Sequence, residues 1–264
     1  YNNGTVPQLW NYTFGAVNKN SCFSGENNKH LTNYYIIPEE WGGPYKENSM
    51  VLIIDTNLNQ ETQNKYSLPW MSTTYSNIGN ITIDWGDGNT TSISNKEITN
   101  NNKSHTYNRA VSSAITITSD NGNIPPFELI AGEEIYCTLL QEVVTPLLHM
   151  CDPFTGEGIT TLSCFAGCTN LISVYDGVFS KNRQATKLDN LFKECKKIYR
   201  MNPKILEGLD IISLEGAFAN SGISSLSTDF MKKCPNVQNV SNMFRGCSFI
   251  KSIPEDFFKY NQYF

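Results

Sequence analysis

Histidines and cysteines are the side chains of this sequence that most readily act as bases, nucleophiles or metal ligands, and it has three of the first and eight of the second. None of the histidines (His30, His105 and His149) stands at a metal-ligand or catalytic spacing from the others. His149 opens a run of ligand types at residues 149–152, but this run falls on a repeated pattern, so a structural role is predicted. His105 is expected to order a turn through hydrogen bonds rather than to act as a base.

Two carboxylates, Asp84 and Asp87, lie beside glycines and could be a calcium pair. Calcium takes six to eight oxygen ligands, whereas aspartate next to glycine is typical of a turn. We therefore expect turn residues here, with no metal and no cofactor.

The cysteines do not have the spacing of a zinc site, because Cys164 and Cys168 are four residues apart and no CxxC occurs. Cys168, Cys195 and Cys247 occupy one position of a repeat, which favours free buried thiols over structural disulfides, the alternative. A nucleophilic cysteine needs a base and a lowered pKa, which a repeated position does not supply. No P-loop, GxGxxG, GxSxG or HExxH motif is present, so we predict no catalytic residues and no enzyme.

Composition excludes several classes of protein. The chain has 264 residues, 12% aromatic and 17% charged, with a net charge of −5. The aromatic content argues against disorder, and the negative charge argues against nucleic acid as a partner. Apolar runs are far shorter than the ~20 residues of a membrane helix. We expect that a leader preceded Tyr1, with a possible lipid anchor upstream of it.

Composition also divides the chain. Of 31 asparagines, 22 precede Pro125, while seven of the eight cysteines follow it. Residues 121–126 (Asn-Gly-Asn-Ile-Pro-Pro) suit a turn and an extended segment rather than a helix. We therefore predict an unplaced segment (1–45, a stalk or extra strands), a first domain (46–124) and a second domain (125–264), the two domains folding separately.

The second domain is a repeat with a period of about 26 residues. Apolar residues open its units at Leu162, Leu188, Leu214 and Val240. Further positions recur in register: Phe165, Phe192, Phe218 and Phe244; Cys168, Cys195, Ser221 and Cys247; Leu171, Ile198, Ile223 and Ile250; Val174, Met201, Leu226 and Ile253. Each unit is too small to bury its apolar face alone, so neighbouring units must stack.

Stacking predicts a ladder of buried rings, with Phe192, Phe218 and Phe244 in contact. The Leu-x-x-Ile/Val step of each unit predicts a short strand in a parallel sheet. Thr145-Pro146 and Asn202-Pro203 have the N-cap and N1 residues of short helices.

These units resemble the BspA-type leucine-rich repeats of bacterial, Bacteroides-like surface proteins. Residues 246–258 (GCSFIKSIPEDFF) are close to that family's unit, and residues 166–174 (AGCTNLISV) match its first part. The resemblance covers about 140–264; Ser221 in place of cysteine, and the missing proline after Val174 and Leu226, depart from it. It implies a surface-displayed binding or adhesion scaffold without catalytic residues.

The first domain has alternating strands at 81–84 and 114–118, with further strands predicted at 51–54 and 66–68. Trp-Gly-Asp-Gly at 85–88, followed by His-Thr-Tyr at 105–107, is similar to the PKD domain, an Ig-like extracellular module. The predicted fold class is thus mixed β and α/β: an N-terminal PKD-like β-sandwich, then a leucine-rich-repeat solenoid.

The resemblances imply a monomeric, non-enzymatic adhesion protein at the cell surface, an outer-membrane lipoprotein, whose partner is a protein or glycan on another cell or matrix. Alternatives are a structural envelope protein without a ligand, or an accessory part of a carbohydrate-processing system. Binding is expected at outward residues of the repeat strands, mainly Arg200 and Tyr175, with Ser173, Asn202, Ser225, Ser227 and Ser252.

Overall fold

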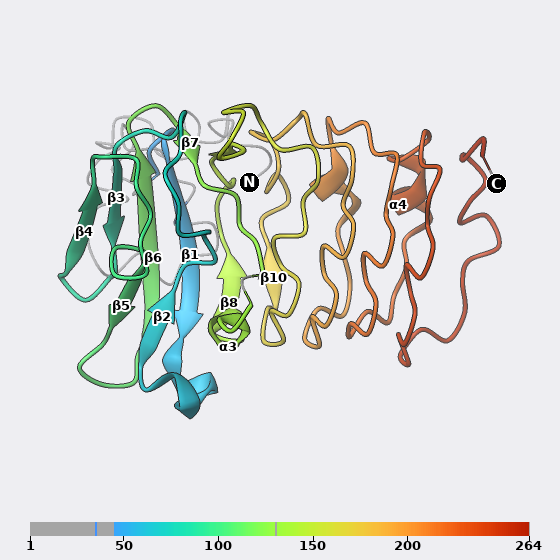
Figure 1. The fold of residues 1–264 in the computed structure, drawn as a ribbon. Coiled ribbons are helices and arrows are strands. Elements are labelled where there is room, and N and C mark those ends of the chain that lie inside the picture. Colours follow the sequence, from blue (N-terminus) through green and yellow to red (C-terminus); the bar gives the residue numbers. More distant parts are fainter. Residues whose placement is uncertain (1–34, 36–44, 130, 264) are drawn as a thin grey trace, which may run out of the picture.

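A six-stranded sheet forms one end of the molecule (Figure 1). The computed structural model describes residue 35, residues 45–129 and residues 131–263. Most of the segment 1–45, including Cys22 and His30, therefore lies outside the described residues. The strand order is β10 (Ser173–Val174), β8 (Leu140–Val143), β1 (Ser49–Asp55), β6 (Ser112–Ser119), β3 (Ile81–Asp84) and β4 (Thr90–Ile93).

Buried and exposed side chains alternate along the inner strands β3 and β6 of this sheet. In β3, Ile81 and Ile83 are buried while Thr82 and Asp84 are exposed, and β6 buries every second residue. β1 lies between β6 and β8 and is buried along most of its length, as expected for a central strand covered on both faces. The strands predicted at 51–54, 66–68, 81–84 and 114–118 are confirmed, with shifts of a few residues at their ends.

Shorter elements surround the sheet. Two small sheets join β2 (Lys65–Ser67) to β5 (Ser104–Thr106) and β7 (Asn123–Ile124) to β9 (His149–Met150). The described helices are α3 (Glu134–Cys137), α4 (Thr228–Lys232) and three 3-10 turns, η4 (Thr56–Leu58), η5 (Gln60–Thr62) and η6 (Pro203–Leu206). No described helix is long and apolar enough to cross a membrane.

The large sheet runs across the expected junction at residues 121–126. Leu52 of β1 pairs with Val143 of β8 in antiparallel register, and β8 pairs in parallel with β10. One apolar core likewise extends from Met50 to Phe257. Both parts of the chain thus share a sheet and a core.

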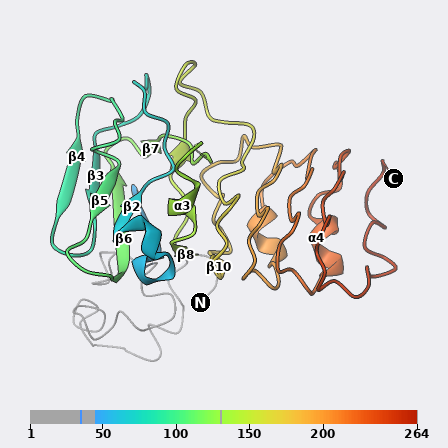
Figure 2. The same ribbon diagram turned by 60° about the horizontal axis from the view of Figure 1, so that its bottom comes forward.

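Beyond β10 the chain continues in successive turns that lie side by side in a row (Figures 1 and 2). Isolated parallel bridges connect neighbouring turns at the sequence period, from Thr161 to Lys187, then to Ser213 and then to Asn239. A further bridge joins Arg200 to Ser225. Most of each turn consists of hydrogen-bonded reverse turns, with η6 and α4 as the helical segments after residue 174.

The predicted fold class is wrong. The described structure is mostly β-sheet with open sheets and two α-helices, and not the predicted mixed fold of a separate sandwich and an α/β solenoid. The sandwich was expected to be separate from the repeats, but β8 and β10 extend the sheet of the first part. Helices were expected in the repeats, but Thr145-Pro146 starts none: the Thr145 hydroxyl instead accepts a hydrogen bond from the backbone N–H of Val51 at 2.8 Å.

The predicted ladder of phenylalanines is confirmed. Ring centroids of Phe165 and Phe192 are 5.4 Å apart, and those of Phe192 and Phe218, and of Phe218 and Phe244, are 5.7 Å apart, all nearly parallel. Phe192 and Phe218 are buried, and Phe244, nearest the chain end, is half-buried. The repeat period of the sequence therefore places each phenylalanine ring next to the equivalent ring of the following unit.

Candidate functional site

The closest pairing between repeats lies in three segments, 187–195, 213–221 and 239–247, here called the paired segments. Alternate backbone N–H groups of one segment donate to carbonyls of the next at 2.7–2.9 Å. The donors of the first segment are Leu188, Asn190, Phe192 and Glu194, and the acceptors are Ser213, Glu215, Ala217 and Ala219. The same pattern joins Leu214, Gly216, Phe218 and Asn220 to Asn239, Ser241, Met243 and Arg245.

Left-handed residues make this pairing possible. Asn190, Gly216 and Asn242, at one repeat position, have φ of 57°, 60° and 57°. A second position, Glu194, Asn220 and Gly246, has φ of 65°, 56° and 72°. In each segment the two left-handed residues lie four positions apart, on either side of the stacked phenylalanine. Asparagine and glycine tolerate this conformation best, so their recurrence was a sequence signal for the paired segments.

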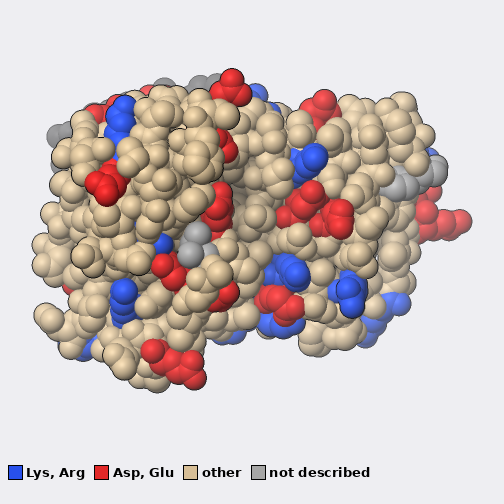
Figure 3. All heavy atoms as spheres, viewed as in Figure 1, with Lys and Arg blue, Asp and Glu red and all other residues tan. Residues whose placement is uncertain are grey.

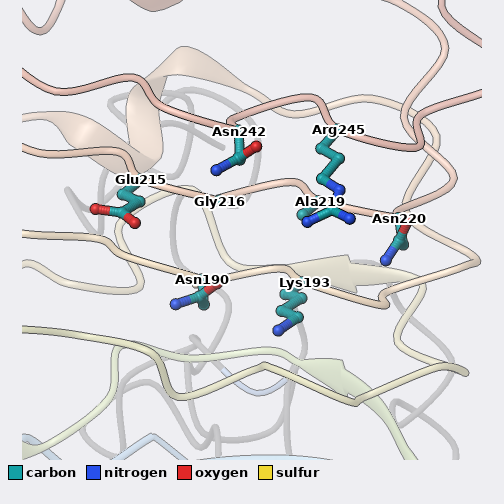
Figure 4. A pocket seen from close by; sticks show the side chains of 8 residues that line it. All are labelled: Asn190, Lys193, Glu215, Gly216, Ala219, Asn220, Asn242 and Arg245. Carbon is teal, nitrogen blue, oxygen red and sulfur yellow. The ribbon is translucent and has the colours of Figure 1, made fainter.

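A hollow of about 210 Å³ opens over the middle paired segment (Figure 4). Its floor is made by Gly216 and Ala219, which are smaller than the residues at the same positions of the flanking units. Its walls come from the two neighbouring units, which contribute Asn190, Lys193, Asn242 and Arg245, and from Glu215 and Asn220 at the rim of the middle unit. The hollow exists because one unit has small residues where the units on either side have long ones.

Gly216 is required for this shape. A Cβ atom at this position would lie 2.6 Å from Oδ1 of Asn190, and φ is +60°. Any larger residue would therefore displace the Asn190 amide from the wall and strain the backbone.

Some polar side chains of the hollow form hydrogen bonds within the protein, and others do not. Glu215 accepts from the Asn239 amide at 2.9 Å, and Asn220 donates to Glu194 at 2.6 Å. Lys193 and Arg245 form no ion pair within the described part of the chain. Two cations and the side-chain amides of Asn190 and Asn242 are therefore available to a ligand.

The Glu194 carboxylate lies beside the hollow and forms two hydrogen bonds. Its hydrogen bond with Lys196, at 2.7 Å, together with that from Asn220, lowers its pKa despite partial burial. Lys196 also donates to the carbonyl of Asn220 at 2.6 Å. These contacts fix the position of Asn220 at the rim of the hollow.

The lining of the hollow consists of two cations, one carboxylate, three side-chain amides and two small residues. Its lining contains no histidine, cysteine or hydroxyl that a base could activate. Among the described residues, no group of three or more His, Cys, Asp or Glu side chains is placed to hold a metal ion. Arginine and lysine with free amides suit a carboxylate that carries further hydrogen-bonding groups.

The binding residues predicted from the sequence lie elsewhere, and none of them lines this hollow. Arg200, Ser225 and Ser252 are exposed, and Arg200 and Ser225 are brought together by their bridge. The Ser173 hydroxyl donates to Glu142 at 3.1 Å, and Tyr175 is half-buried.

Two further predicted binding residues cap helices. The Asn202 side chain accepts from the N–H of Lys204 at 3.1 Å at the start of η6, as the Asn-Pro pair predicted, although the segment is a 3-10 turn. Ser227 accepts from the N–H of Asp229 at 3.2 Å at the start of α4. Their polar side chains therefore satisfy the backbone.

All seven described cysteines are free, and six of them are buried. In the repeats the Cys195 thiol donates to the carbonyl of Phe165 at 3.1 Å, and the Cys247 thiol to that of Phe218 at 2.9 Å. Burial raises the pKa of Cys234 to about 12 and also raises that of Cys195. In Cys137, by contrast, a hydrogen bond with Cys168 lowers the pKa.

Asp84 at the end of β3 and His105 in β5 both form hydrogen bonds at the turn that contains Asp87, so the predicted turn contacts are confirmed. The N–H of Gly86 donates to Asp84 at 2.9 Å, and that of Asn89 donates to Asp87 at 3.0 Å. Nε2 of His105 is 2.8 Å from Oδ2 of Asp87, and the imidazole ring stacks on Trp85 at 5.3 Å. These contacts join the two halves of the Trp-Gly-Asp-Gly and His-Thr-Tyr pattern.

The Asp87 contact predicts a pH dependence. Burial raises the pKa of Asp87, but hydrogen bonds from His105 and Asn89 outweigh it, so the pKa lies below its ordinary value. Such a carboxylate stabilises the fold above its unfolded pKa, and this contribution is lost as the pH falls through the folded pKa. Asp87→Asn should therefore cost up to about 1 kcal/mol at neutral pH and progressively less in acid.

Urea unfolding of Asp87→Asn and of wild type across this pH range measures the difference. Glu157→Gln, at an exposed carboxylate, is the control and should change little. A cost for Asp87→Asn that stays constant with pH would contradict the assignment.

Charged groups of both signs are scattered over the face seen in Figure 3, and most of that surface is uncharged. Comparison of the chain with protein-family models, curated proteins and solved structures found no match. The PKD and BspA resemblances therefore stay predictions, and the hollow over Gly216 and Ala219 is the candidate site.

Proposed function

We propose that the chain is a non-enzymatic binding module, displayed at a cell surface, that holds a carboxylate-bearing group of an extracellular ligand in the hollow over Gly216 and Ala219. The observation that carries this proposal is that two cations, Lys193 and Arg245, line one hollow from the units on either side of it.

Size supports recognition of a single group. Pockets that enclose drug-sized ligands have about 300–1,000 Å³, and this hollow has about 210 Å³. It accommodates one sugar ring or one side chain of a larger ligand. Glu215 at one end would repel a second carboxylate, which favours a ligand with one negative group at the cationic end.

Binding should depend on both cations. A screen of the purified chain against acidic glycans and acidic peptides identifies the ligand, and Lys193→Ala combined with Arg245→Ala should then weaken it at least tenfold, or ~1.4 kcal/mol. Both side chains are exposed, so the fold should survive. Affinity should also fall with added salt, because exposed charges carry the contact.

Arg200→Ala combined with Lys204→Ala is the matched control, because it removes two cations that lie outside the hollow, both from the repeat that contains Lys193. It should leave affinity unchanged. If the control weakens binding and the Lys193/Arg245 variant does not, the site lies on the face with Arg200 instead. A folded Lys193/Arg245 variant with unchanged affinity would refute the proposed site.

A further inference from the structure

Two cysteines meet where the first part of the chain joins the repeats. Cys137 is the last residue of α3, and Cys168 lies in the first repeat unit, which opens at Leu162. A hydrogen bond joins the two thiols, and both residues line one small cavity together with Cys164. The fold therefore brings two free thiols into contact from segments that are far apart in the sequence.

The cavity beside the pair has room only for a small molecule. Its volume is about 10 Å³, close to the space that one water molecule needs, and Tyr66 and Phe127 also line it. Cys137 is 9% exposed, and Cys168 is 3% exposed. A small oxidant therefore reaches Cys137 more readily than Cys168, whereas the thiol of another protein is too large to approach either.

The hydrogen bond makes the two thiols unequal. It lowers the pKa of Cys137 despite burial and the carboxylates of Glu134 and Glu133, and it raises the pKa of Cys168 together with burial. The proton of the pair therefore stays on Cys168, whose S–H donates to the sulfur of Cys137. Thiolate is the form of cysteine that attacks oxidants, so Cys137 is the reactive member of the pair. Burial alone, by contrast, raises the pKa of Cys151.

We propose that Cys137 and Cys168 are an oxidation site, at which hydrogen peroxide converts the two contacting thiols into a disulfide. The Cys137 thiolate attacks one oxygen of the peroxide, the O–O bond breaks, and the departing hydroxide takes a proton to become water. Cys137 is then a sulfenic acid.

Cys168 completes the reaction as the resolving thiol. Its sulfur attacks Sγ of Cys137, the S–S bond forms and the S–O bond breaks. The departing hydroxide takes the proton of the Cys168 thiol as a second water. Two thiols are oxidised while one peroxide is reduced to two waters. The proposal does not depend on the hollow over Gly216 and Ala219 or on its ligand.

The disulfide would fasten the first part of the chain to the repeats. It would tie the end of α3, just before β8, to the first repeat unit. A cross-link that closes a long segment restricts the unfolded chain. The oxidised chain should therefore have a Tm about 5–10 °C above that of the reduced chain, and dithiothreitol should reverse the shift.

Peptide mapping of the full chain tests the proposal. The reduced, folded chain is treated with hydrogen peroxide, and the remaining thiols are then alkylated in denaturant. Cleavage after glutamate gives a peptide with Cys137 (135–142) and one with Cys168 (158–194), and cleavage after Phe165 separates Cys168 from the other cysteine of that peptide. Mass spectrometry should find Cys137 linked to Cys168. Cys137 should also lose its thiol at least about tenfold faster than the buried Cys151.

Two variants separate the roles of the pair. In Cys168→Ser the disulfide cannot form, and dimedone should trap the sulfenic acid at Cys137. Cys151→Ser is the matched control: it removes a buried thiol outside the cavity and should leave the Cys137–Cys168 link and the Tm shift unchanged. Circular dichroism checks that each variant is folded.

Three results would overturn the proposal. The first is a folded wild-type chain in which peroxide forms no link at Cys137, a result that needs no variant to fold. The second is a link from Cys137 to Cys164 in place of Cys168. The third is a Cys137 thiol that is oxidised no faster than that of Cys151.

Discussion

Phe218→Ala is expected to lower the free energy of unfolding by about 3–5 kcal/mol. Phe218 is 3% exposed and lies between Phe192 and Phe244, with ring centroids 5.7 Å away on each side. Phe230 of α4 meets it edge-on at 5.6 Å. Truncation removes the favourable transfer free energy of the ring. It also leaves a cavity that the three neighbouring rings cannot fill without shifting from their present positions.

Urea denaturation followed by circular dichroism measures this loss. Phe154→Ala is the matched control, because Phe154 is 80% exposed and its truncation creates no cavity. The control should change stability by less than about 0.5 kcal/mol. A loss below about 1 kcal/mol for Phe218→Ala would show that the ring stack does not stabilise the fold.

Glu133→Ala should lower the free energy of unfolding by about 2–4 kcal/mol, the second largest loss that we expect. Lys103 is 1% exposed, and its ammonium donates to Glu133 at 2.9 Å and to the carbonyl of Trp70 at 2.7 Å. Glu133, just before α3, is the one carboxylate within ion-pair distance of this lysine among the described residues. Its removal leaves a buried charge with a carbonyl as its remaining partner.

Lys103→Met separates the loss of the pair from the burial of an unpaired charge. Methionine fills a similar volume without charge, and replacing a buried ion-pair member in this way is tolerated better than stranding it. Thermal or urea unfolding of the two single variants and the double variant should show that Glu133→Ala is less stable than Lys103→Met. If Lys103→Met is the less stable, the ion pair contributes more than the desolvation of Lys103 costs.

Local spacing determined several features directly. The alternation of Ile81 and Ile83 with polar residues predicted β3, because side chains of a strand point to opposite faces in turn. The period of 26 predicted the stack of Phe192, Phe218 and Phe244, since equal spacing along the chain places equal residues side by side once units pack. Turn roles for Asp84 and Asp87 followed from the adjacent glycines.

Tertiary structure decided what depends on which segments meet. β8 joined β1, and so the first part shares its sheet and core with the repeats, because an open strand edge pairs with whatever segment packs against it. Backbone pairing between repeats formed mainly at the paired segments, which contain left-handed residues. The predicted strands that contain Ser173 and Arg200 contribute less of it. The hollow arose because Ala219 lies between Lys193 and Arg245, and Gly216 lies between Asn190 and Asn242. This contrast in size forms a hollow only when neighbouring units are in register. Spacing along the chain is a local property, whereas a binding site is made by side chains from several segments.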